Sequence, residues 1–259
     1  MREFKIWIKY TINSFEQTLY NKMSVVIFLL GKFLRITLFL IFLNFLVQGS
    51  KGLAGYSREQ IIFFYLSFNL ADSAAQLLFR EVYRFRELIV SGNFDFVLAR
   101  PLNPLIRVLL GGADILDLFM LILITFFSIW FAAVSFHPSI SQWLFYALMV
   151  LNGLLIAAAF HIFVLGIGIL TTSIDHLIMV YRDLSSMARI PVDIYIEPIR
   201  SLLTFAIPLG IMMTFPPKAL MGLLSGQFIA VSIIIGLALL FLSLKFWSYS
   251  LKQYQSTSS

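Results

Sequence analysis

Long apolar runs with few charges recur along this chain, and each is close to the length that a helix needs to cross a lipid bilayer. A transmembrane helix needs about 20 consecutive, mostly apolar residues. The runs that meet this requirement lie at about 25–48, 58–79, 104–134, 142–171 and 226–248. Only 12% of the residues are charged and 60% are hydrophobic, which excludes a water-soluble domain with an ordinary polar surface. We therefore expect one all-α membrane domain over residues 1–259.

The stretch between the fourth and the last of these spans allows two topologies. Hydropathy favours a span near 199–215, whereas 173–192 can cross only with Arg182 and Asp183 near the middle of the membrane. In the second case, 194–225 enters and leaves on the same face as a re-entrant hairpin, which is tolerated when it packs in protein or lines a cavity. The prolines that favour this hairpin are Pro191, Pro198, Pro208, Pro216 and Pro217. Both topologies give six crossings and place both termini on one side.

Basic residues predict which side of the membrane each loop faces, because loops rich in Lys and Arg stay in the cytoplasm. Eleven basic residues fall on one side of the predicted spans and three on the other. The first set is Arg2, Lys5, Lys9, Lys22, Arg80, Arg84, Arg86, Arg100, Arg107, Lys245 and Lys252, and the second is Lys51, Arg58 and Lys218. Both termini are therefore expected in the cytoplasm. The net charge of +6 reflects this orientation rather than nucleic-acid binding, since the basic residues are dispersed among the spans.

The first 24 residues predict a helix that lies in the membrane interface. Apolar side chains recur at helical spacing at Phe4, Trp7, Ile8, Ile12 and Phe15, while charged residues fill other positions. The segment lacks a compact apolar core followed by a small-residue cleavage site, so a cleavable signal peptide is not expected. The absence of cysteine excludes disulfides and thiolate chemistry.

No recognised catalytic or nucleotide-binding motif occurs in the chain. Gly31-Lys32 lacks the upstream glycine and the following hydroxyl residue of a phosphate-binding loop, and neither a GxSxG nor an HExxH pattern occurs. His137, His161 and His176 are far apart in the sequence and do not form a ligand set. We therefore expect no catalytic residue, metal site or cofactor in this chain.

At this point the residues leave two functional classes open. The first is an intramembrane enzyme that uses Asp114, Asp117, His161 or His176 on a lipid-like substrate, although the spacing shows no convergent site. The second is an ATP-independent channel or a membrane scaffold. Activity of this chain alone favours the enzyme, and flux that needs no energy source favours the channel.

Ionisable residues within or beside the predicted spans have two interpretations. Asp114 and Asp117 lie three residues apart on one helical face, with Arg107 two turns earlier. They form either an interfacial charge network or the lining of a substrate route, because ionisable groups at membrane depth are often functional. Arg182 and Asp183 have the same two interpretations, and as adjacent helical residues they point in different directions and do not pair closely.

Small residues recur at four-residue spacing at Gly153 and Ala157, and again at Gly222, Gly226 and Ala230. Such spacing lets helices approach closely. The close approach can occur inside one chain or between two subunits, and the sequence leaves both possibilities open.

The loop at 80–104 carries more helix and turn signals than a simple connection needs. Val82, Phe85 and Ile89 share one helical face, and Gly92 provides a natural helix stop. These signals predict a short amphipathic helix on the membrane surface, then a turn, then a proline-bounded lead into the third span. The helix either anchors the loop at the bilayer interface or presents a rigid surface to a cytosolic protein.

This loop resembles the first cytoplasmic loop of ABC type-2 permeases that have six spans. The pattern I-x-x-G-x-x-D-x-x-L-x-R-P of that loop is filled by Ile89, Gly92, Asp95, Leu98, Arg100 and Pro101. Further matches lie at 55–57, 191–195, 203–208, 216–217 and 220–222. The resemblance extends over most of the chain, from about 30 to 250, and departs from the family pattern at Pro217 and at the Arg182–Asp183 pair.

The resemblance implies a transmembrane permease subunit of an ATP-binding cassette exporter in the inner or plasma membrane. Two such subunits, identical or different, assemble with two separate cytosolic ATPase subunits, which bind ATP and Mg²⁺. The loop helix corresponds to the coupling helix that is seated on the ATPase. The residues implied in ATPase coupling are Arg84, Glu87, Ser91, Gly92, Asn93, Asp95, Arg100 and Pro101.

The resemblance also favours one of the two topologies. It implies that 173–192 is a true fifth span and that 194–225 is a hairpin that dips into the membrane from outside. The expected cargo is a lipid, a drug or a peptide-like molecule. The residues expected along the translocation path or at its gate are Asp114, Asp117, Arg182, Asp183, Pro191, Pro208 and Pro216.

Overall fold

The computed structural model describes residues 2–50, 53–171 and 174–255, and the regular secondary structure in these ranges is helical apart from one isolated bridge between Leu53 and Tyr56. Five helices are long and apolar enough to cross a membrane, and a pair of shorter, bent helices gives a sixth candidate when it is counted as one span. The expected all-α architecture with several apolar helices is therefore confirmed. Lys51 and Ser173, which entered the sequence predictions, lie outside the described residues.

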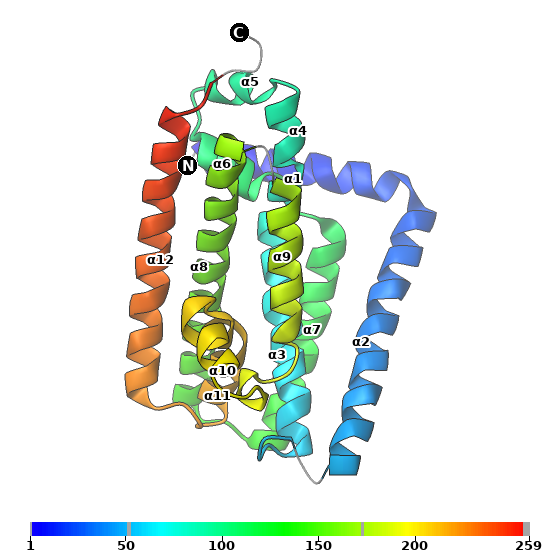
Figure 1. Cartoon of the computed structure of the whole chain (residues 1–259). Helices are drawn as coiled ribbons and strands as arrows, with labels where there is room; N and C mark the ends of the chain where they lie inside the picture. Colours follow the sequence, from blue (N-terminus) through cyan, green and yellow to red (C-terminus); the bar gives the residue numbers. More distant parts are fainter. Residues whose placement is uncertain (1, 51–52, 172–173, 256–259) are drawn as a thin grey trace.

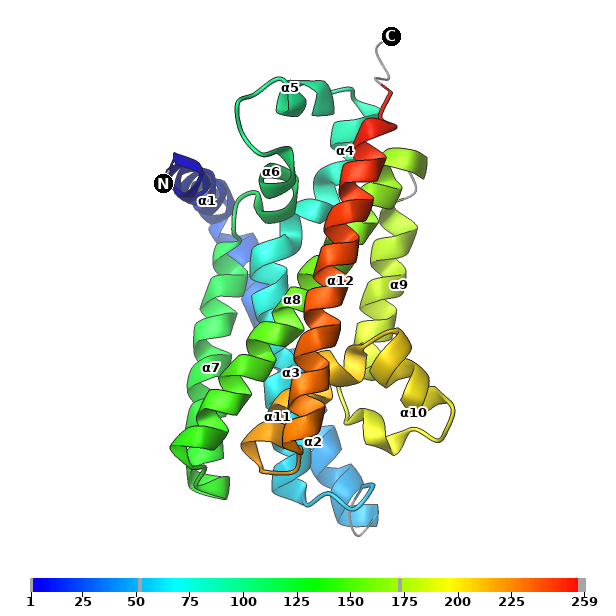
Figure 2. The same cartoon turned by 90° about the vertical axis from the view of Figure 1, so that its left-hand side faces the viewer.

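The long helices stand side by side in one bundle, with shorter helices at both ends (Figure 1). In chain order the α-helices are α1 (Arg2–Tyr20), α2 (Lys22–Ser50), α3 (Arg58–Phe79), α4 (Phe85–Val90), α5 (Phe94–Leu98), α6 (Pro104–Leu110), α7 (Ile115–Phe136), α8 (Ile140–Thr171), α9 (Ile174–Met187), α10 (Ile199–Ser201), α11 (Phe215–Leu220) and α12 (Gly226–Lys252). Short 3-10 or π-helical segments are η1 (Arg80–Arg84), η2 (Val192–Ile194), η3 (Leu202–Ala206) and η4 (Gly210–Thr214). Helices α1, α4, α5 and α6 and the end of α12 lie at one end of the bundle, and α10 and α11 lie toward the other (Figure 1 and Figure 2).

Helix α8 forms the centre of the bundle, where it packs along α12 and also contacts α3 and α11. Gly153 of α8 lies against Met212, whose carbonyl oxygen is 2.8 Å from the position that a Cβ would take. At Gly236 of α12, the space of a side chain is filled by the amide of Asn152, whose Nδ2 donates to the Ser232 carbonyl at 3.0 Å. The close approach at Gly153 is therefore between segments of the same chain.

Helices α1 and α2 form an angled pair at the edge of the bundle (Figure 1). α1 lies across the end of the bundle, and α2 runs down one side. None of the apolar window of α2 is buried within the chain, and side chains such as Phe33, Leu34 and Leu38 are exposed. A helix that is apolar around its circumference and exposed in this way is typical of a span that contacts lipid or another chain.

Two helix starts follow the capping signals of the sequence. Ser57 and Gln60 form a reciprocal capping box at α3, with each side chain accepting from the other residue's backbone N–H, at 3.3 Å and 2.8 Å. Asn103 caps α6, because its Oδ1 accepts from the Leu105 backbone N–H at 2.9 Å, and Pro104 occupies the first turn. Local sequence therefore fixes both ends of the loop between these helices.

The short helix predicted in the loop corresponds to α4, which η1 separates from α3. Helical structure runs from Arg58 through these three segments and ends at Val90. Its predicted apolar face is correct, since Val82, Phe85 and Ile89 are buried. Gly92 follows with φ of +72°, the left-handed conformation that glycine adopts most readily, and ends the helix as expected.

The predicted third span starts too early, because 104–134 is broken into α6 and α7. Gly111 adopts φ of +37°, and the side chain of Glu81 occupies the space that a Cβ would need there. Asp114 then starts α7 by accepting a hydrogen bond at 2.7 Å from the Leu116 backbone N–H. The break allows the chain to pass the buried Glu81 and to change direction before the long apolar helix.

The segment between α9 and α12 is not one continuous helix. Its two halves, Ile199–Ala206 and Gly210–Leu220, are bent by 81° relative to each other, and Pro208 lies between them. α9 ends and α12 begins toward the same end of the bundle, on either side of this segment (Figure 1). The proline-rich sequence therefore forms the broken backbone that its composition predicted.

Candidate functional site

Aromatic side chains fix the back of the loop that holds α4 and α5. Phe85 of α4 and Phe94 of α5 are buried, and their ring centroids lie 5.2 Å apart in an edge-to-face arrangement. Phe85 also packs against Trp247 of α12 at 6.3 Å between centroids, and Phe94 packs against Tyr254 at 5.2 Å. Both helices of the loop are therefore attached to the C-terminal end of the last span.

A hydrogen bond strengthens this attachment. The hydroxyl of Tyr254 donates to Oδ1 of Asp95 at 2.9 Å. Burial and the neighbouring carboxylate raise the pKa of Tyr254 to about 12, so the hydroxyl remains a neutral donor at physiological pH. Asp95, which the sequence resemblance assigns to ATPase coupling, thus has a structural partner within the chain.

The opposite side of the loop is exposed. Of the residues predicted to couple to an ATPase, Arg84, Glu87, Ser91, Asn93, Arg100 and Pro101 are exposed, and Gly92 and Asp95 are partly buried. Two apolar residues, Val90 and Phe96, share this exposure, at 58% and 67% of their surface. The sequence prediction missed both. The signal that could have found them is an apolar residue placed off the buried face of a short, otherwise polar loop.

Helix α1 is joined to the same loop by two arginines. Arg107 forms an ion pair with the buried Glu81 at 2.8 Å, and its guanidinium lies 4.5 Å from the ring centroid of Tyr10. Arg100 donates to the Tyr10 hydroxyl at 3.1 Å. Arg107 therefore connects α6 with Glu81 of η1 and with Tyr10 of α1.

Asp114 and Asp117 meet other cations instead. Nη1 of Arg80 lies 2.9 Å from a carboxylate oxygen of Asp114 and 2.8 Å from one of Asp117. Lys32 of α2 forms a second ion pair with Asp117, whose side chain is fully buried. These contacts form a charge network that joins α2, η1 and α7. A buried carboxylate needs such partners, because an unpaired charge is costly away from water.

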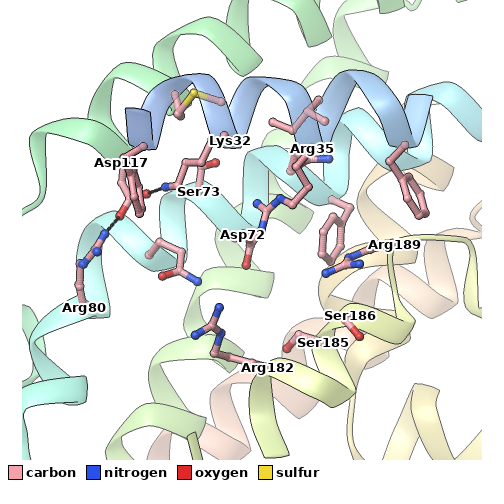
Figure 3. A pocket seen from close by; sticks show the side chains of 18 of the residues that line it. Lys32, Arg35, Asp72, Ser73, Arg80, Asp117, Arg182, Ser185, Ser186 and Arg189 are labelled. Carbon is pink, nitrogen blue, oxygen red and sulfur yellow. Dashed lines mark hydrogen bonds and ion pairs between the residues drawn. The ribbon is translucent and has the colours of Figure 1, made fainter. Parts of the chain in front are cut away.

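A cavity of about 770 Å³ lies between α2, α3 and α9, with further lining from η1 and α7. Its charged lining residues are Lys32, Arg35, Asp72, Arg80, Arg84, Asp117, Arg182 and Arg189. Figure 3 shows Arg182 pointing from α9 toward Asp72 of α3, with Arg80 and Lys32 meeting at Asp117 on another side of the cavity. The helices that form the cavity are far apart in the sequence, so only the packing of the bundle brings these charges together.

The cavity is lined by two of the residues predicted for a translocation path, Asp117 and Arg182. Asp114 and Asp183 are not in its lining. The structure adds basic and acidic residues that the prediction did not include, namely Lys32, Arg35, Asp72, Arg80, Arg84 and Arg189. Most of these are ionisable residues inside or beside the apolar runs, which is itself a recognisable sequence signal.

The prolines predicted to form a gate lie in the bent segment and are not in the lining of the cavity. Pro191 and Pro216 are buried, and Pro208 is partly buried between the two half-helices. The backbone N–H of Val192 donates to Oγ1 of Thr214 at 3.1 Å, which joins the two ends of this segment. The prolines therefore shape a packed unit next to α8.

An ionic contact ties this bent segment to the loop before α3. The hydroxyl of Tyr56 and the ammonium of Lys218 donate to the two carboxylate oxygens of Asp193, each at 2.8 Å. Burial, together with the adjacent Asp193, raises the pKa of Tyr56 above its ordinary value. The contact lies at the end of the bundle away from α4 and α5 (Figure 1).

The residues of the enzyme alternative have separate partners. Nδ1 of His161 lies 2.7 Å from the carbonyl oxygen of Ala157, and its ring packs against Phe79 and Tyr181 at centroid distances of 5.1 and 4.9 Å. Asp117 is engaged by its cations instead. Within residues 2–50, 53–171 and 174–255, no group of three or more His, Cys, Asp or Glu side chains could hold a metal ion.

Comparisons with known proteins point to one family. A family model described as "ABC-2 family transporter protein" matches residues 33–258. The matched range begins within α2 and includes the loop, most of the cavity lining and the bent segment. A comparison with curated proteins found no match.

Proposed function

Since the chain belongs to the ABC-2 family of transporters, we propose that it is the transmembrane permease subunit of an ATP-binding cassette exporter. It forms the translocation path together with a second permease subunit, identical or different. Two cytosolic ATPase subunits bind ATP and Mg²⁺ and supply the free energy, and this chain breaks no bond itself. The cargo is a lipid, a drug or a peptide-like molecule.

In this proposal the six crossings are α2, α3, α7, α8, α9 and α12, and 194–225 dips into the membrane from outside. The bend of 81° between the two half-helices supports a re-entrant path. The placement of α9 and α12, which flank the segment at one end of the bundle, supports it as well (Figure 1). The excess of basic residues in the loops supports a cytoplasmic position of α4, α5 and both termini.

The observation that carries the proposal is the two-sided character of the loop at 80–104. One side is fixed to α12 through Phe85 and Phe94, and the other side exposes Val90 and Phe96 beside polar residues. An apolar anchor within a polar rim is typical of a protein-binding surface. The tip of the loop, with α5, is therefore the part that we assign to the ATPase.

The same loop is connected to several spans. α4 is joined to α3 through the short segment η1, the aromatic contacts attach α4 and α5 to α12, and α6 leads into α7. A push by the ATPase subunits during ATP binding is transmitted along these rigid connections, and the two permease subunits move relative to each other. ATP binding then selects one of two arrangements of the permease pair.

Thiol crosslinking tests the assignment directly, because the chain has no cysteine and one introduced cysteine marks one position. Phe96→Cys, treated with a short thiol-to-amine crosslinker in membranes of the native cell, is expected to form an adduct. Peptide masses should identify the partner as an ATP-binding cassette ATPase. Ser141→Cys, an exposed position at the start of α8, is the matched control and is expected to give no such adduct.

A second measurement separates transport from simple contact. Phe96→Asp is expected to insert into the membrane normally and to lose ATP-driven export, because a charge replaces the apolar anchor. Two results contradict the proposal: Phe96→Cys that reacts with a thiol reagent but gives no ATPase adduct, and cargo flux that proceeds without nucleotide.

A further inference from the structure

One wall of the cavity is formed by α9 and the turn that follows it, which together contribute two arginines and two serines. The four residues of this wall that line the cavity are Arg182, Ser185, Ser186 and Arg189. Arg182 is three residues before Ser185, and Ser186 is three residues before Arg189. Residues three or four apart lie on the same face of a helix. The side chain of Arg182 points into the cavity, and Arg189 lies further along the same wall (Figure 3).

The cavity has a strong excess of positive charge. Its lining contains six basic residues and two acidic ones, which gives 6 − 2 = +4. The network around Asp117 uses Lys32 and Arg80. In the part of the chain that the structure describes, neither Arg182 nor Arg189 forms an ion pair. Arg182 and Arg189 are therefore available to a bound anion.

The wall opposite α9 is mixed in chemistry. α2 contributes two basic residues, Lys32 and Arg35, together with the apolar residues Ile27, Phe28, Ile36 and Phe39. The guanidinium of Arg189 lies 6.0 Å from the ring centroid of Phe39, where the two walls approach each other. The cavity thus combines cations from both walls with apolar residues of α2, a helix whose apolar surface is largely exposed.

We propose that this cavity binds an acidic amphiphile, with a phosphate-type headgroup held by Arg35, Arg182 and Arg189 and its apolar part lying along α2. The inference rests on the proposed permease function and names the chemical class of its cargo. Unpaired arginines are costly at membrane depth, and an anionic group compensates them. Guanidinium groups bind phosphate in a bidentate manner, and the volume of about 770 Å³ suits a ligand site.

The charge balance disfavours other occupants. A cationic drug is repelled by the net positive lining, and a neutral molecule leaves Arg182 and Arg189 without an anionic partner. An apolar helix of a second permease subunit is disfavoured for the same reason, since it would bury these guanidinium groups without compensation.

Binding to purified, full-length chain tests the inference with two lipids that differ only in headgroup charge. Dioleoyl phosphatidic acid and dioleoyl phosphatidylcholine are titrated separately, and native mass spectrometry reads the bound fraction. Phosphatidic acid is expected to bind more tightly. Arg182→Gln combined with Arg189→Gln is expected to weaken its binding by about tenfold or more, because each charged hydrogen bond is worth about that factor.

The control variant is Arg200→Gln, which removes an exposed arginine that is outside the cavity lining and is paired with Glu197. It is expected to leave the binding of phosphatidic acid unchanged. Arg182→Lys keeps the charge but loses the bidentate geometry. It is expected to bind phosphatidic acid more tightly than Arg182→Gln and more weakly than the unchanged chain. Partial rescue of this kind supports recognition of the headgroup charge.

Three outcomes overturn the inference. They are equal binding of the two lipids, unchanged binding after loss of both Arg182 and Arg189, and displacement of phosphatidic acid by an equal concentration of inorganic phosphate. The last identifies a site for free phosphate. Because the Phe96→Cys adduct is read independently, loss of lipid selectivity with an intact ATPase adduct rejects only the cargo class. Selective binding without any ATPase adduct rejects the proposed function instead.

Discussion

The hydroxyl of Tyr254 and the carboxylate of Asp95 lie 2.9 Å apart, although 159 positions separate them in the sequence. The contact joins the residues after α12 to the first turn of α5, at the tip of the loop that we assign to the ATPase. A position that the family pattern associates with coupling is therefore also part of the internal structure. This distinction decides which substitutions can test coupling without disturbing the loop.

Tyr254→Phe is expected to loosen α5 while keeping its aromatic packing. The variant retains the ring that packs edge-on against Phe94 and loses one hydrogen bond, worth about 1 kcal/mol. Hydrogen exchange of the backbone at 92–98 should become faster by about fivefold. Tyr249→Phe, at an exposed position of α12, is the matched control. Equal protection in the two variants contradicts a structural role for the hydrogen bond.

The same contact predicts a dependence on alkaline pH. Burial and Asp95 raise the pKa of Tyr254 to about 12, whereas an unfolded tyrosine titrates near 10. Because the folded pKa is raised, the stabilisation is fully present below about pH 10 and is lost as the pH rises through about 12. Exchange protection of α5 is expected to fall in this window in the native chain and to show no such step in Tyr254→Phe.

Removal of Asp117 is expected to destabilise the bundle more than removal of Asp114. Asp117 is fully buried and pairs with both Lys32 and Arg80, so Asp117→Ala removes the ion pair of Lys32 and leaves Arg80 with Asp114 alone, at a cost of about 3 kcal/mol or more. Asp114→Ala removes a helix cap and one shared ion pair, at a cost of about 1 kcal/mol. Thermal unfolding in detergent measures both. An equal decrease of the unfolding temperature in the two variants would show that burial of the carboxylate does not decide the loss of stability.

Gly111→Ala is expected to destabilise the break between α6 and α7 by about 2 kcal/mol. Alanine is strained at a φ of +37°, and its Cβ meets the side chain of Glu81, which must move away from Arg107. Gly226→Ala is the matched control, because a Cβ at that position meets open space. Comparable unfolding temperatures for the two variants contradict the need for glycine at the break.

Much of the local structure could be predicted from the sequence. The capping box at Ser57 and Gln60, the cap at Asn103 and the buried face of Val82, Phe85 and Ile89 depend on residues that are close in the chain. Such signals act over one or two turns and are read directly from spacing. The family resemblance seen in the loop is confirmed by the match over residues 33–258.

The break at Gly111 could not be predicted from local sequence signals. Apolar character continues through 104–134, so hydropathy gave one long span. The chain breaks there because Glu81, thirty positions earlier, occupies the space beside Gly111, a contact that no local pattern contains. The same long-range packing sets the ion pairs. Asp114 pairs with Arg80, Asp117 pairs with Arg80 and Lys32, and Arg107 pairs with Glu81.

The sequence by itself determined that this chain is an all-α membrane protein with a structured, basic loop, because span length, apolar composition and capping residues are local quantities. Only the tertiary structure decided which charges meet. The packing of α2, α3 and α9 places Arg35, Asp72 and Arg182 around one cavity, and the end of α12 supplies Tyr254 to Asp95. Such contacts depend on how distant helices pack, and the long-range geometry that sets their electrostatics is absent from any single stretch of sequence.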